Sequence, residues 1–532
     1  MNPAPTSSPD TEVLIAGAGP TGLNLALWLA RLGIRVRIVD KSPYPAAHSR
    51  ALAVQARTLE FYQQLGFAQE LVERGHRVPA LNLWVAGRQV AHAPFGDLGR
   101  GLSPFPFALV FPQDEHEPLL IHYLAALGVH VERSTELLSF TESSRPSDKS
   151  HAPIIARLRL ADGSEQTCRA NFLAGSDGAR SIVRQSLAIG FPGGDYTHLF
   201  YVADVTATGP VANGELHVAL DDADFLAVFP LDDTGRVRLV GTIREELVEQ
   251  AEHNHSELTW NDVSKRVLDW IHVDVQQVNW FSTYRVHHRV AEHFRHNNVF
   301  LLGDAAHIHS PVGGQGMNTG IGDAVNLAWK LANVLRDRAP MSLLDTYEAE
   351  RMAFARRLVS TTDQAFTAVT SSSDLARVLR LHIVPHLIPA LLSSNASRRF
   401  MFRTVSQTAI NYRASALSEG RTGKLRAGDR LPWLQFPDDP KSPYPDNFAP
   451  LASLDYQVHI YSTWRCPDIG RLCVQRGLDF HVFPWQPAFA ASGFVENACY
   501  LIRPDGYLAF ADPPAKARTL AAYLDAHGLN FA

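Results

Sequence analysis

Two glycine-rich segments that lie far apart in the sequence carry most of its chemical information. The first is Gly17-Ala18-Gly19-Pro20-Thr21-Gly22, between an apolar run at 13–16 and a helical pattern at 23–32. That order of strand, turn and helix opens a βαβ unit. In such a loop the first glycine allows a tight turn, the second lets a pyrophosphate approach the backbone, and the third lets the helix pack on the strand. The helix N-terminus adds free N–H groups and a positive dipole end.

An acidic residue follows the second strand of this unit. Asp40 closes the apolar run at 36–39 and precedes Lys41. An acid at this position can bond a ribose hydroxyl. The segment therefore predicts a dinucleotide site made by Gly17, Gly19, Pro20, Thr21, Gly22, Asp40 and Lys41. An ordinary tight turn is the alternative, and the loop alone does not separate FAD from NAD.

The second segment is Gly303-Asp304-Ala305-Ala306-His307, followed by Pro311 and by Gly313-Gly314-Gln315-Gly316-Met317-Asn318. Between the two segments lies Gly175-Ser176-Asp177-Gly178. Taken singly, each is a glycine-rich turn with an acid. Taken together and in this order, the three motifs resemble those of the single-component FAD-dependent aromatic hydroxylases, the p-hydroxybenzoate and phenol hydroxylase type.

The resemblance implies specific flavin contacts. The region of Asp177 would touch the pyrophosphate, and Asp304 would bond the ribityl chain. A helix beginning near Met317 would aim its N–H groups at the N1–C2=O edge of the flavin, where reduced flavin is negative. The isoalloxazine ring would lie near Pro311, Gly314, Gly316, Met317 and Asn318, the ribityl region near Gln113, and the ring also near Arg50. Arg50 and Pro311 are the candidate catalytic residues, no base is assigned, and His307 is expected to pack beneath its motif.

The resemblance also implies a reaction. FAD would be bound tightly but non-covalently, and NADPH or NADH would reduce it transiently. Reduced FAD would take up O2 as a C4a-hydroperoxide and deliver OH to an electron-rich phenolic or polycyclic aromatic ring. Baeyer–Villiger insertion, epoxidation and flavin dehydrogenation on the same scaffold stay open. A flavin-binding module without turnover is the more distant alternative.

Bulk properties exclude several classes of protein. A net charge of −5 argues against a nucleic-acid binder. Four cysteines without a CxxC pair predict neither a disulfide framework nor a metal site. No secretory signal is visible, and the longest apolar run, 378–392, contains Arg380 and two prolines, so no membrane span is expected. We expect the cytoplasm, and a homodimer is left open.

The 532 residues predict two or three domains. We expect an α/β fold: a Rossmann-type FAD-binding domain with an inserted antiparallel-sheet substrate domain and a C-terminal thioredoxin-like domain. The expected limits are 1–185 and 286–425 for the FAD-binding domain, 186–285 for the substrate domain with a contribution from 80–110, and 426–532 for the C-terminal domain.

Finer expectations concern the substrate and the local elements. Apolar strands predict a pocket for a large apolar aromatic molecule, lined by Phe225, Ala227, Phe229 and Leu239. Residues 245–273 are expected to form one helix, Pro118 to lie in the first turn of a helix at 117–127, and 431–447 to form a linker. Cys466 lacks a partner cysteine, so the C-terminal domain is expected to be structural or an oligomer contact.

Overall fold

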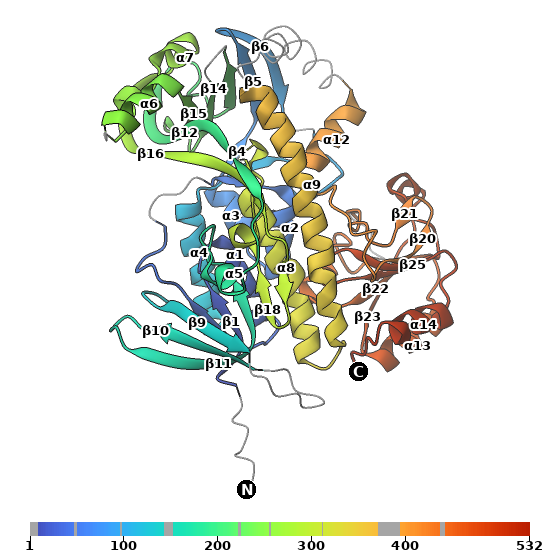
Figure 1. Ribbon diagram of the computed structural model, residues 1–532. Helices are drawn as coiled ribbons and strands as arrows, with labels where there is room; N and C mark the ends of the chain where they lie inside the picture. The colour runs from blue at the N-terminus through green and yellow to red at the C-terminus, as the bar shows by residue number, and fades with distance from the viewer. Residues whose placement is uncertain are drawn as a thin grey trace.

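The protein is described here by a computed structural model. It describes residues 9–46, 51–95, 98–142, 153–221, 225–254, 257–310, 312–370, 394–436 and 442–532. Within these ranges the chain forms three large β-sheets and one of three strands (Figure 1). In Figure 1 the second large sheet lies above the first, and the third lies on the right.

The first sheet is built around β1 (Thr11–Ala16). β1 pairs in parallel with β2 (Val36–Val39) and with β11 (Glu165–Gly175). The strand order is β17-β18-β11-β1-β2-β8, with β9 and β10 in an antiparallel extension from β11. The remaining strands are β8 (Val131–Glu132), β9 (Glu136–Glu142), β10 (Ile154–Arg159), β17 (Arg295–His296) and β18 (Val299–Leu301). The central strands are apolar and buried because helices cover the sheet, as in other parallel sheets.

Helix α1 (Pro20–Arg31) packs between α8 (Gly316–Leu335) and α4 (Gln113–Ala126). The expected start of α4 was wrong: the helix begins at Gln113, so Pro118 lies inside it rather than in its first turn. The short sheet order is β3-β7-β4. Its strands are β3 (Ala53–Val54), β4 (His76–Val78) and β7 (Ala108–Val110), and the chain between β3 and β4 forms α2 (Ala56–Leu65) and α3 (Ala68–Arg74). Helix α5 (Ile182–Ser186) packs against β9 and β11 of the first sheet.

The second large sheet has the strand order β19-β16-β12-β15-β14-β13-β5-β6. All neighbours are antiparallel except β13 and β5, which are parallel. The strands are β5 (Ala80–Val85), β6 (Arg88–Pro94), β12 (Gly193–Thr208), β13 (Leu216–Leu220), β14 (Phe225–Pro230), β15 (Arg236–Ile243), β16 (Asp274–Val290) and β19 (His307–Ile308). Strands β5 and β6 thus join a sheet made mainly by residues 193–290, and the domain limits themselves stay a prediction.

One face of this sheet packs under α6 (Glu245–Asn254) and α7 (Lys265–Trp270). The expectation of one helix over 245–273 was wrong. The chain turns at Thr259, whose side chain caps the short 3-10 helix η1 (Trp260–Asp262) while Asp262 bonds back to the N–H of Thr259. This capping box starts a new helical turn and so breaks the run.

The third sheet has the order β21-β20-β25-β24-β22-β23. Strands β22 (Gln457–Tyr461) and β23 (Asp479–Phe483) are parallel and joined by α13 (Pro467–Arg476); β24 (Cys499–Ile502) and β25 (Leu508–Asp512) form an antiparallel hairpin followed by α14 (Ala517–Ala526). This is a thioredoxin-like arrangement. β20 (Glu419–Thr422) and β21 (Leu425–Arg426) extend it. The expected linker at 431–447 was wrong for its described part, because Leu431, Leu434 and Phe436 are buried in the core of this sheet.

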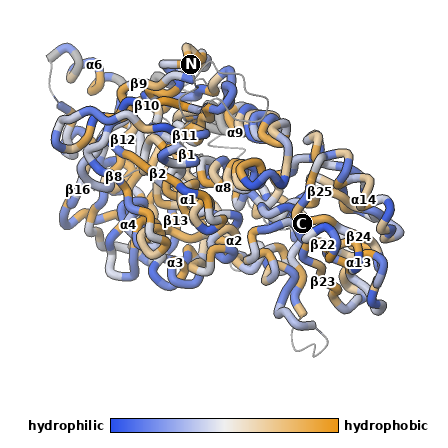
Figure 2. Tube along the Cα trace, turned by 90° about the horizontal axis from the view of Figure 1, so that it is seen from below, coloured by the Kyte–Doolittle hydropathy of each residue, from blue (hydrophilic) through white to orange (hydrophobic). Residues whose placement is uncertain are grey.

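The third sheet does not stand apart from the rest of the chain. In Figures 1 and 2 its lobe lies beside α8 and α2. Trp329 of α8 meets Tyr456 with ring centroids 5.6 Å apart, and one apolar core runs through both parts. The other helices are α9 (Asp345–Thr370), α12 (Asn395–Val405), η4 (Met341–Leu344), η6 (Ala449–Ser453) and η7 (Pro487–Ser492).

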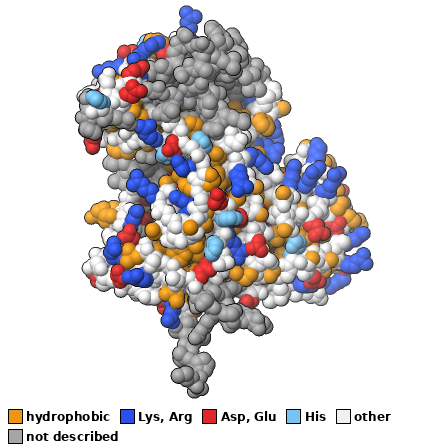
Figure 3. All heavy atoms as spheres, viewed as in Figure 1, with side chains coloured by type: hydrophobic (Ala, Val, Ile, Leu, Met, Phe, Trp, Pro, Cys, Tyr) orange, Lys and Arg blue, Asp and Glu red, His pale blue; other side chains and the backbone are white. Residues whose placement is uncertain are grey.

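The surface is mixed in character. Figure 3 shows acidic, basic and apolar side chains interspersed on one face, with Lys and Arg gathered near β20 and β21. Among the described helices, none combines the length and the apolar character that crossing a membrane requires. The apolar run at 378–392 lies outside the described residues.

Candidate flavin site

The glycine loop lies between β1 and α1, at the carboxyl edge of the first sheet. Gly17 has φ +101°, and a Cβ there would collide with the carbonyl of Ser176. A Cβ on Gly22 would collide with the carbonyl of Gly17. A Cβ on Gly19 would meet no protein atom within 4 Å. The fold therefore requires glycine at 17 and 22, whereas Gly19 leaves free the space through which a ligand can reach the backbone.

Asp40, which follows β2, holds this loop by a hydrogen bond to its backbone. One oxygen of its carboxylate accepts the N–H of Ala18 at 2.7 Å, and the other accepts the N–H of Ser42 at 2.8 Å. Lys41, next to it, is exposed. The structure thus brings Asp40 against the loop, in the position where the Rossmann arrangement holds a ribose.

The second motif forms a 3-10 turn, η2 (Gly303–Ala305). Asp304 is exposed while Gly303 and Ala305 on either side of it are buried. The N–H of Gly303 donates to Asp323 at 3.0 Å, and the imidazole of His307 lies 2.6 Å from the same carboxylate oxygen. His307 is 2% exposed, so it packs beneath the motif as expected.

Asp323 is the anchor of this turn. Its other oxygen accepts from Nε of Arg351 at 2.6 Å. Burial alone would raise the pKa of Asp323, but the charge of Arg351 and the hydrogen bonds from Arg351 and His307 hold that pKa below its usual range. Asp323 and Arg351 were given no role from sequence, because their meeting depends on how α9 packs on α8.

The start of α8 follows a tight glycine turn, η3 (Val312–Gly314), in which Gly313 and Gly314 have φ +76° and +61°. The first helical bond of α8 runs from Thr319 to Gln315, so the N–H groups of residues 316–318 precede it. The side chain of Asn318 is already engaged: Oδ1 accepts from Gln55 and Thr58, and Nδ2 donates to Ala53 and Gly314. Only the backbone N–H of Asn318 is therefore left to serve a ligand.

The Asp-Gly motif is held next to the second motif. Arg184 donates to the carbonyl of Ala305 at 2.8 Å and to that of Ala179 at 2.8 Å. Asp177 accepts the N–H groups of Ile182 and Val183 with one oxygen. Its other oxygen is buried and has no hydrogen-bond partner in the described part of the chain, and burial raises the pKa of this carboxyl.

A second buried atom without a partner belongs to His309. Nδ1 lies 2.9 Å from the carbonyl of Ser310, so the neutral ring donates there and leaves Nε2 as an acceptor. Burial lowers the pKa of His309 to about 4, so the ring is neutral at pH 7. Nε2 has no partner within the described ranges, and the ring lies beside Gly316. Sequence reasoning missed His309, although its position two residues before Pro311 could have pointed to it.

Gln113, the first residue of α4, donates through its side chain to Glu117 at 2.7 Å and through its N–H to the carbonyl of Ala51 at 3.1 Å. It thus lies next to the segment that carries Arg50. Arg50 and Pro311 lie outside the described residues, so their assignment stays a prediction. Pro20 and Thr21 open α1, and the hydroxyl of Thr21 lies against Gly303 and Gly320, which joins the first motif to the second.

These groups fit a flavin dinucleotide. The open side of Gly19, the exposed Asp304, the unpaired oxygen of Asp177 and the N-terminus of α8 belong to one connected set of turns around the carboxyl ends of β1, β11 and β18. That edge is where open α/β sheets bind their ligands.

Comparison with known proteins decides the family. Residues 10–362 match the family model described as FAD binding domain. 6-Methylpretetramide 4-monooxygenase of Streptomyces rimosus is 37% identical over 432 residues, which are 80% of this chain and 74% of that protein. The chain belongs to the FAD-dependent aromatic hydroxylases.

Two further comparisons extend the match. Pentachlorophenol 4-monooxygenase of Sphingobium chlorophenolicum is 33% identical over 441 residues, 81% of this chain and 77% of that protein. In fold, the chain is similar to aklavinone-11 hydroxylase solved with FAD and aklavinone: the TM-score is 0.76 at 24% identity, over 98% of this chain and 99% of that one. The protein is therefore a flavoprotein monooxygenase that uses FAD and is reduced by NADH or NADPH.

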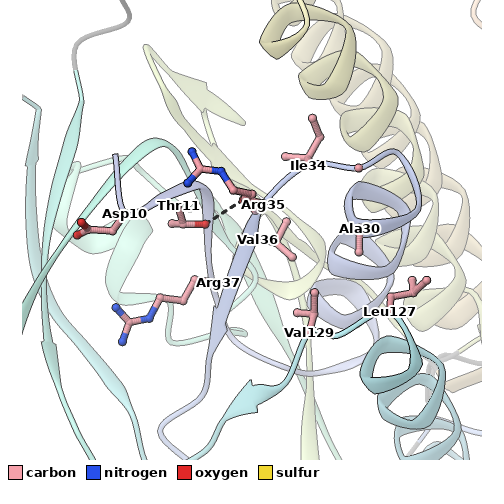
Figure 4. Close-up of a pocket in the computed structure, with 10 residues that line it drawn as sticks. Asp10, Thr11, Ala30, Ile34, Arg35, Val36, Arg37, Leu127 and Val129 are labelled. Atoms are coloured by element: carbon pink, nitrogen blue, oxygen red, sulfur yellow. Dashed lines mark hydrogen bonds between the residues drawn. The ribbon is translucent and has the colours of Figure 1, made fainter. Parts of the chain in front are cut away.

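A hollow elsewhere on this hydroxylase is unrelated to the flavin loops. A cleft of about 500 Å³ opens at the amino ends of β1 and β2, lined among others by Asp10, Thr11, Arg35 and Arg37 (Figure 4). It lies at the opposite end of these strands from Gly17. Arg37 is engaged there by Glu132 at 2.7 Å.

The expected substrate residues of the hydroxylase do not share one face of the second sheet. Phe225, Ala227 and Phe229 alternate along β14, and pairing places Leu239 of β15 opposite Val228. Leu239 and Val228 are buried in the core under α6 and α7. Leu239 was therefore wrongly grouped with the other three, because the two-residue period of adjacent strands puts it on the other side.

The face that carries Phe229 is not purely apolar. Arg238 lies directly opposite Phe229 and is 1% exposed. It bonds Asp204 through two nitrogens, at 2.6 and 2.7 Å, and lies over the ring of Trp280. Its third nitrogen, Nη1, is buried without a partner among the described residues. The sequence 237–240 looks like an apolar strand around Arg238, and strand pairing buries this arginine on the same face as Phe229.

Proposed function

We propose that this hydroxylase acts on a large, mainly apolar aromatic molecule, phenolic or polycyclic, that binds along the face of the second sheet formed by Phe225, Ala227 and Phe229. One observation carries the proposal. Phe229 packs in one apolar cluster with Leu52 and Ala53. Ala53 in turn contacts Gly314, in the glycine turn that precedes α8. An apolar surface and the start of α8 thus adjoin each other.

Arg238 supplies the polar contact within this site. Its Nη1 can donate to one oxygen of the ring system, a phenolate or a ring carbonyl, while Asp204 keeps the guanidinium in place. Such a contact inside an apolar face favours substrates that carry oxygen at one end. The names of two relatives support a ring system of this kind: one acts on 6-methylpretetramide, and one was solved with aklavinone.

When bound, FAD supplies the oxygen chemistry, with O2 and NADPH or NADH as co-reactants. The residues of the chain bind and orient it. The N–H groups of the glycine loop are proposed to hold the phosphates, with the region of Asp177 beside them. The Asp304 carboxylate would accept from the ribityl hydroxyls, and the N–H groups of 316–318 would bind the negative edge of the reduced ring. The apolar side chains of β14 exclude water from the same space.

The test is an anaerobic and then aerobic stopped-flow measurement with NADH or NADPH and a panel of phenols, naphthols and polycyclic quinols. We expect polycyclic substrates to accelerate flavin reduction and to incorporate one oxygen atom from labelled dioxygen into a ring position. Acceleration by simple phenols alone would contradict the proposed substrate class. If the products were ring-expanded esters or epoxides, the reaction would be Baeyer–Villiger insertion or epoxidation and not hydroxylation. If neither NADH nor NADPH reduced the bound flavin, the proposed catalysis would be refuted. A homodimer and a cytoplasmic location stay predictions.

A further inference from the structure

A cluster of buried charges lies where the C-terminal sheet meets the flavin-binding helices. The turn between β24 and β25 carries Arg503 and Asp505, which contact each other at 2.6 Å. Arg503 bonds both oxygens of Glu350 in α9, at 2.7 and 2.9 Å. Lys330 of α8 bonds Glu350 at 2.9 Å. None of these four side chains is more than 2% exposed.

The cluster is electrically balanced, with two cations and two anions. Burial alone would raise the pKa of Glu350, but Arg503 and Lys330 hold that pKa far below its usual range, so the carboxyl is ionised. Buried ion pairs lose their hydration, and an apolar contact of the same volume often holds two elements together as well. We therefore expect this buried charge cluster to fix the relative positions of the elements that it joins.

The same turn reaches a third element of the flavin site. Arg57 of α2 donates to the carbonyl of Asp505, and Gln64 of α2 donates to that of Pro504 at 3.4 Å. Gln55, which precedes α2, donates its N–H to Asn318 at the start of α8. The turn at 503–506 thus contacts α2, α8 and α9 together.

From the cluster, direct contacts lead to the flavin motifs. Glu350 is followed in α9 by Arg351, which bonds Asp323 and the carbonyl of Thr319. Asp323 holds the N–H of Gly303, as described above. The guanidinium of Arg351 also donates to the hydroxyl of Tyr412 at 2.9 Å, and that of Arg503 lies 5.0 Å from the ring centroid of the same Tyr412.

We propose that Arg503 and Asp505 are positioning residues of the flavin site: the C-terminal domain, through its β24–β25 turn, fixes α2, α8 and α9 against one another and so fixes Gly303 and the N–H groups at the start of α8. This inference rests on the proposed flavin contacts. It gives the C-terminal domain, which lacks the second cysteine of a redox pair, a part in cofactor binding.

The test uses the full-length holoprotein with Arg503→Met/Asp505→Asn, which removes one charge of each sign and so leaves the cluster balanced. The matched control is Arg476→Met/Asp525→Asn, which removes an exposed ion pair within the same domain. We measure the dissociation constant of FAD and the midpoint potential of the bound flavin, at temperatures where circular dichroism shows each variant folded. We expect FAD to bind at least about tenfold more weakly.

The potential separates positioning from mere docking of the domain. A displaced helix end stabilises reduced flavin less, so the potential of the Arg503→Met/Asp505→Asn variant should become more negative, while the control matches the wild type. Arg503→Lys keeps the charge but loses the two-pronged contact, so it should lie in between and serves if the double variant does not fold. If the melting temperatures of Arg503→Met/Asp505→Asn and Arg503→Lys fell while their FAD affinity and flavin potential stayed at the wild-type values, the proposal would be overturned. Wild-type protein that binds FAD but hydroxylates nothing would refute the proposed function and leave this test intact.

Discussion

At the scale of single residues, the flavin loop separates what the fold needs from what the cofactor needs. Gly17 is required by the protein, because its φ is positive and a side chain would strike Ser176. Gly19 has φ −78° and open space on its free side. No contact within the described chain explains a glycine there, so the reason lies in the ligand.

This difference makes a prediction. Gly19→Ala should melt like the wild type when stripped of FAD but bind FAD at least about tenfold more weakly, since the new methyl group occupies the path to the pyrophosphate. Gly17→Ala should lower the stability of the apoprotein itself, by at least about 1–2 kcal/mol from backbone strain alone. Thermal unfolding of both apoproteins and FAD titration by fluorescence quenching give the two readouts. Equal FAD affinity of Gly19→Ala and wild type would show that no phosphate passes close to this residue.

At the scale of elements, the two faces of the second sheet pack against different parts of the chain. Leu226, Val228 and Leu239 form the core under α6 and α7, while Phe225, Ala227 and Phe229 face the other way. Under the proposed function, the two faces of this sheet therefore separate stability from substrate binding. The two sets alternate in sequence and differ in their surroundings.

Two truncations on these neighbouring strands should differ in which property they change most, stability or KM. Leu239→Ala should cost about 2–5 kcal/mol of stability, because Leu239 is fully buried, and should leave the KM for the aromatic substrate unchanged. Phe229→Ala should cost less stability, since Phe229 is only partly buried, and should raise KM and release more hydrogen peroxide per NAD(P)H. Chemical denaturation and steady-state kinetics measure the two effects. If Leu239→Ala alone changed KM, the assignment of the faces would be reversed.

At the scale of the whole molecule, the C-terminal sheet shares its core with the flavin-binding part. Trp329 and Tyr456 pack edge to face across the boundary. The charge cluster around Glu350 is buried at the same boundary. Separating the two parts would expose both an apolar surface and four buried charges. An interface of this kind is not expected to open on its own.

The protein should therefore unfold as one unit. Differential scanning calorimetry of the holoprotein should show one cooperative transition, with the ratio of van't Hoff to calorimetric enthalpy near one. Arg503→Met/Asp505→Asn should lower its temperature, and Arg476→Met/Asp525→Asn should leave it almost unchanged. Two resolved transitions in the wild type would show that the C-terminal domain is energetically independent.

Features that depend on neighbours along the chain were predictable from the residues alone. The glycine loop, Asp40, the Gly-Asp turn and the turn before α8 are short motifs whose residue types follow from local backbone geometry, and the structure places them together. The family and its fold class were predictable for the same reason. The thioredoxin-like C-terminal domain was likewise predicted from the resemblance to the family.

Other features depend on how distant segments pack against one another. The face occupied by Leu239 depends on strand register, which a shift of one residue inverts. The burial of Arg238 depends on β12, which places Asp204 beside its guanidinium. The charges of Lys330, Glu350 and Arg503 come from three elements that are distant in sequence, so their meeting is a property of packing. Contacts between distant residues carry no local pattern, and that is the physical reason the sequence did not reveal them.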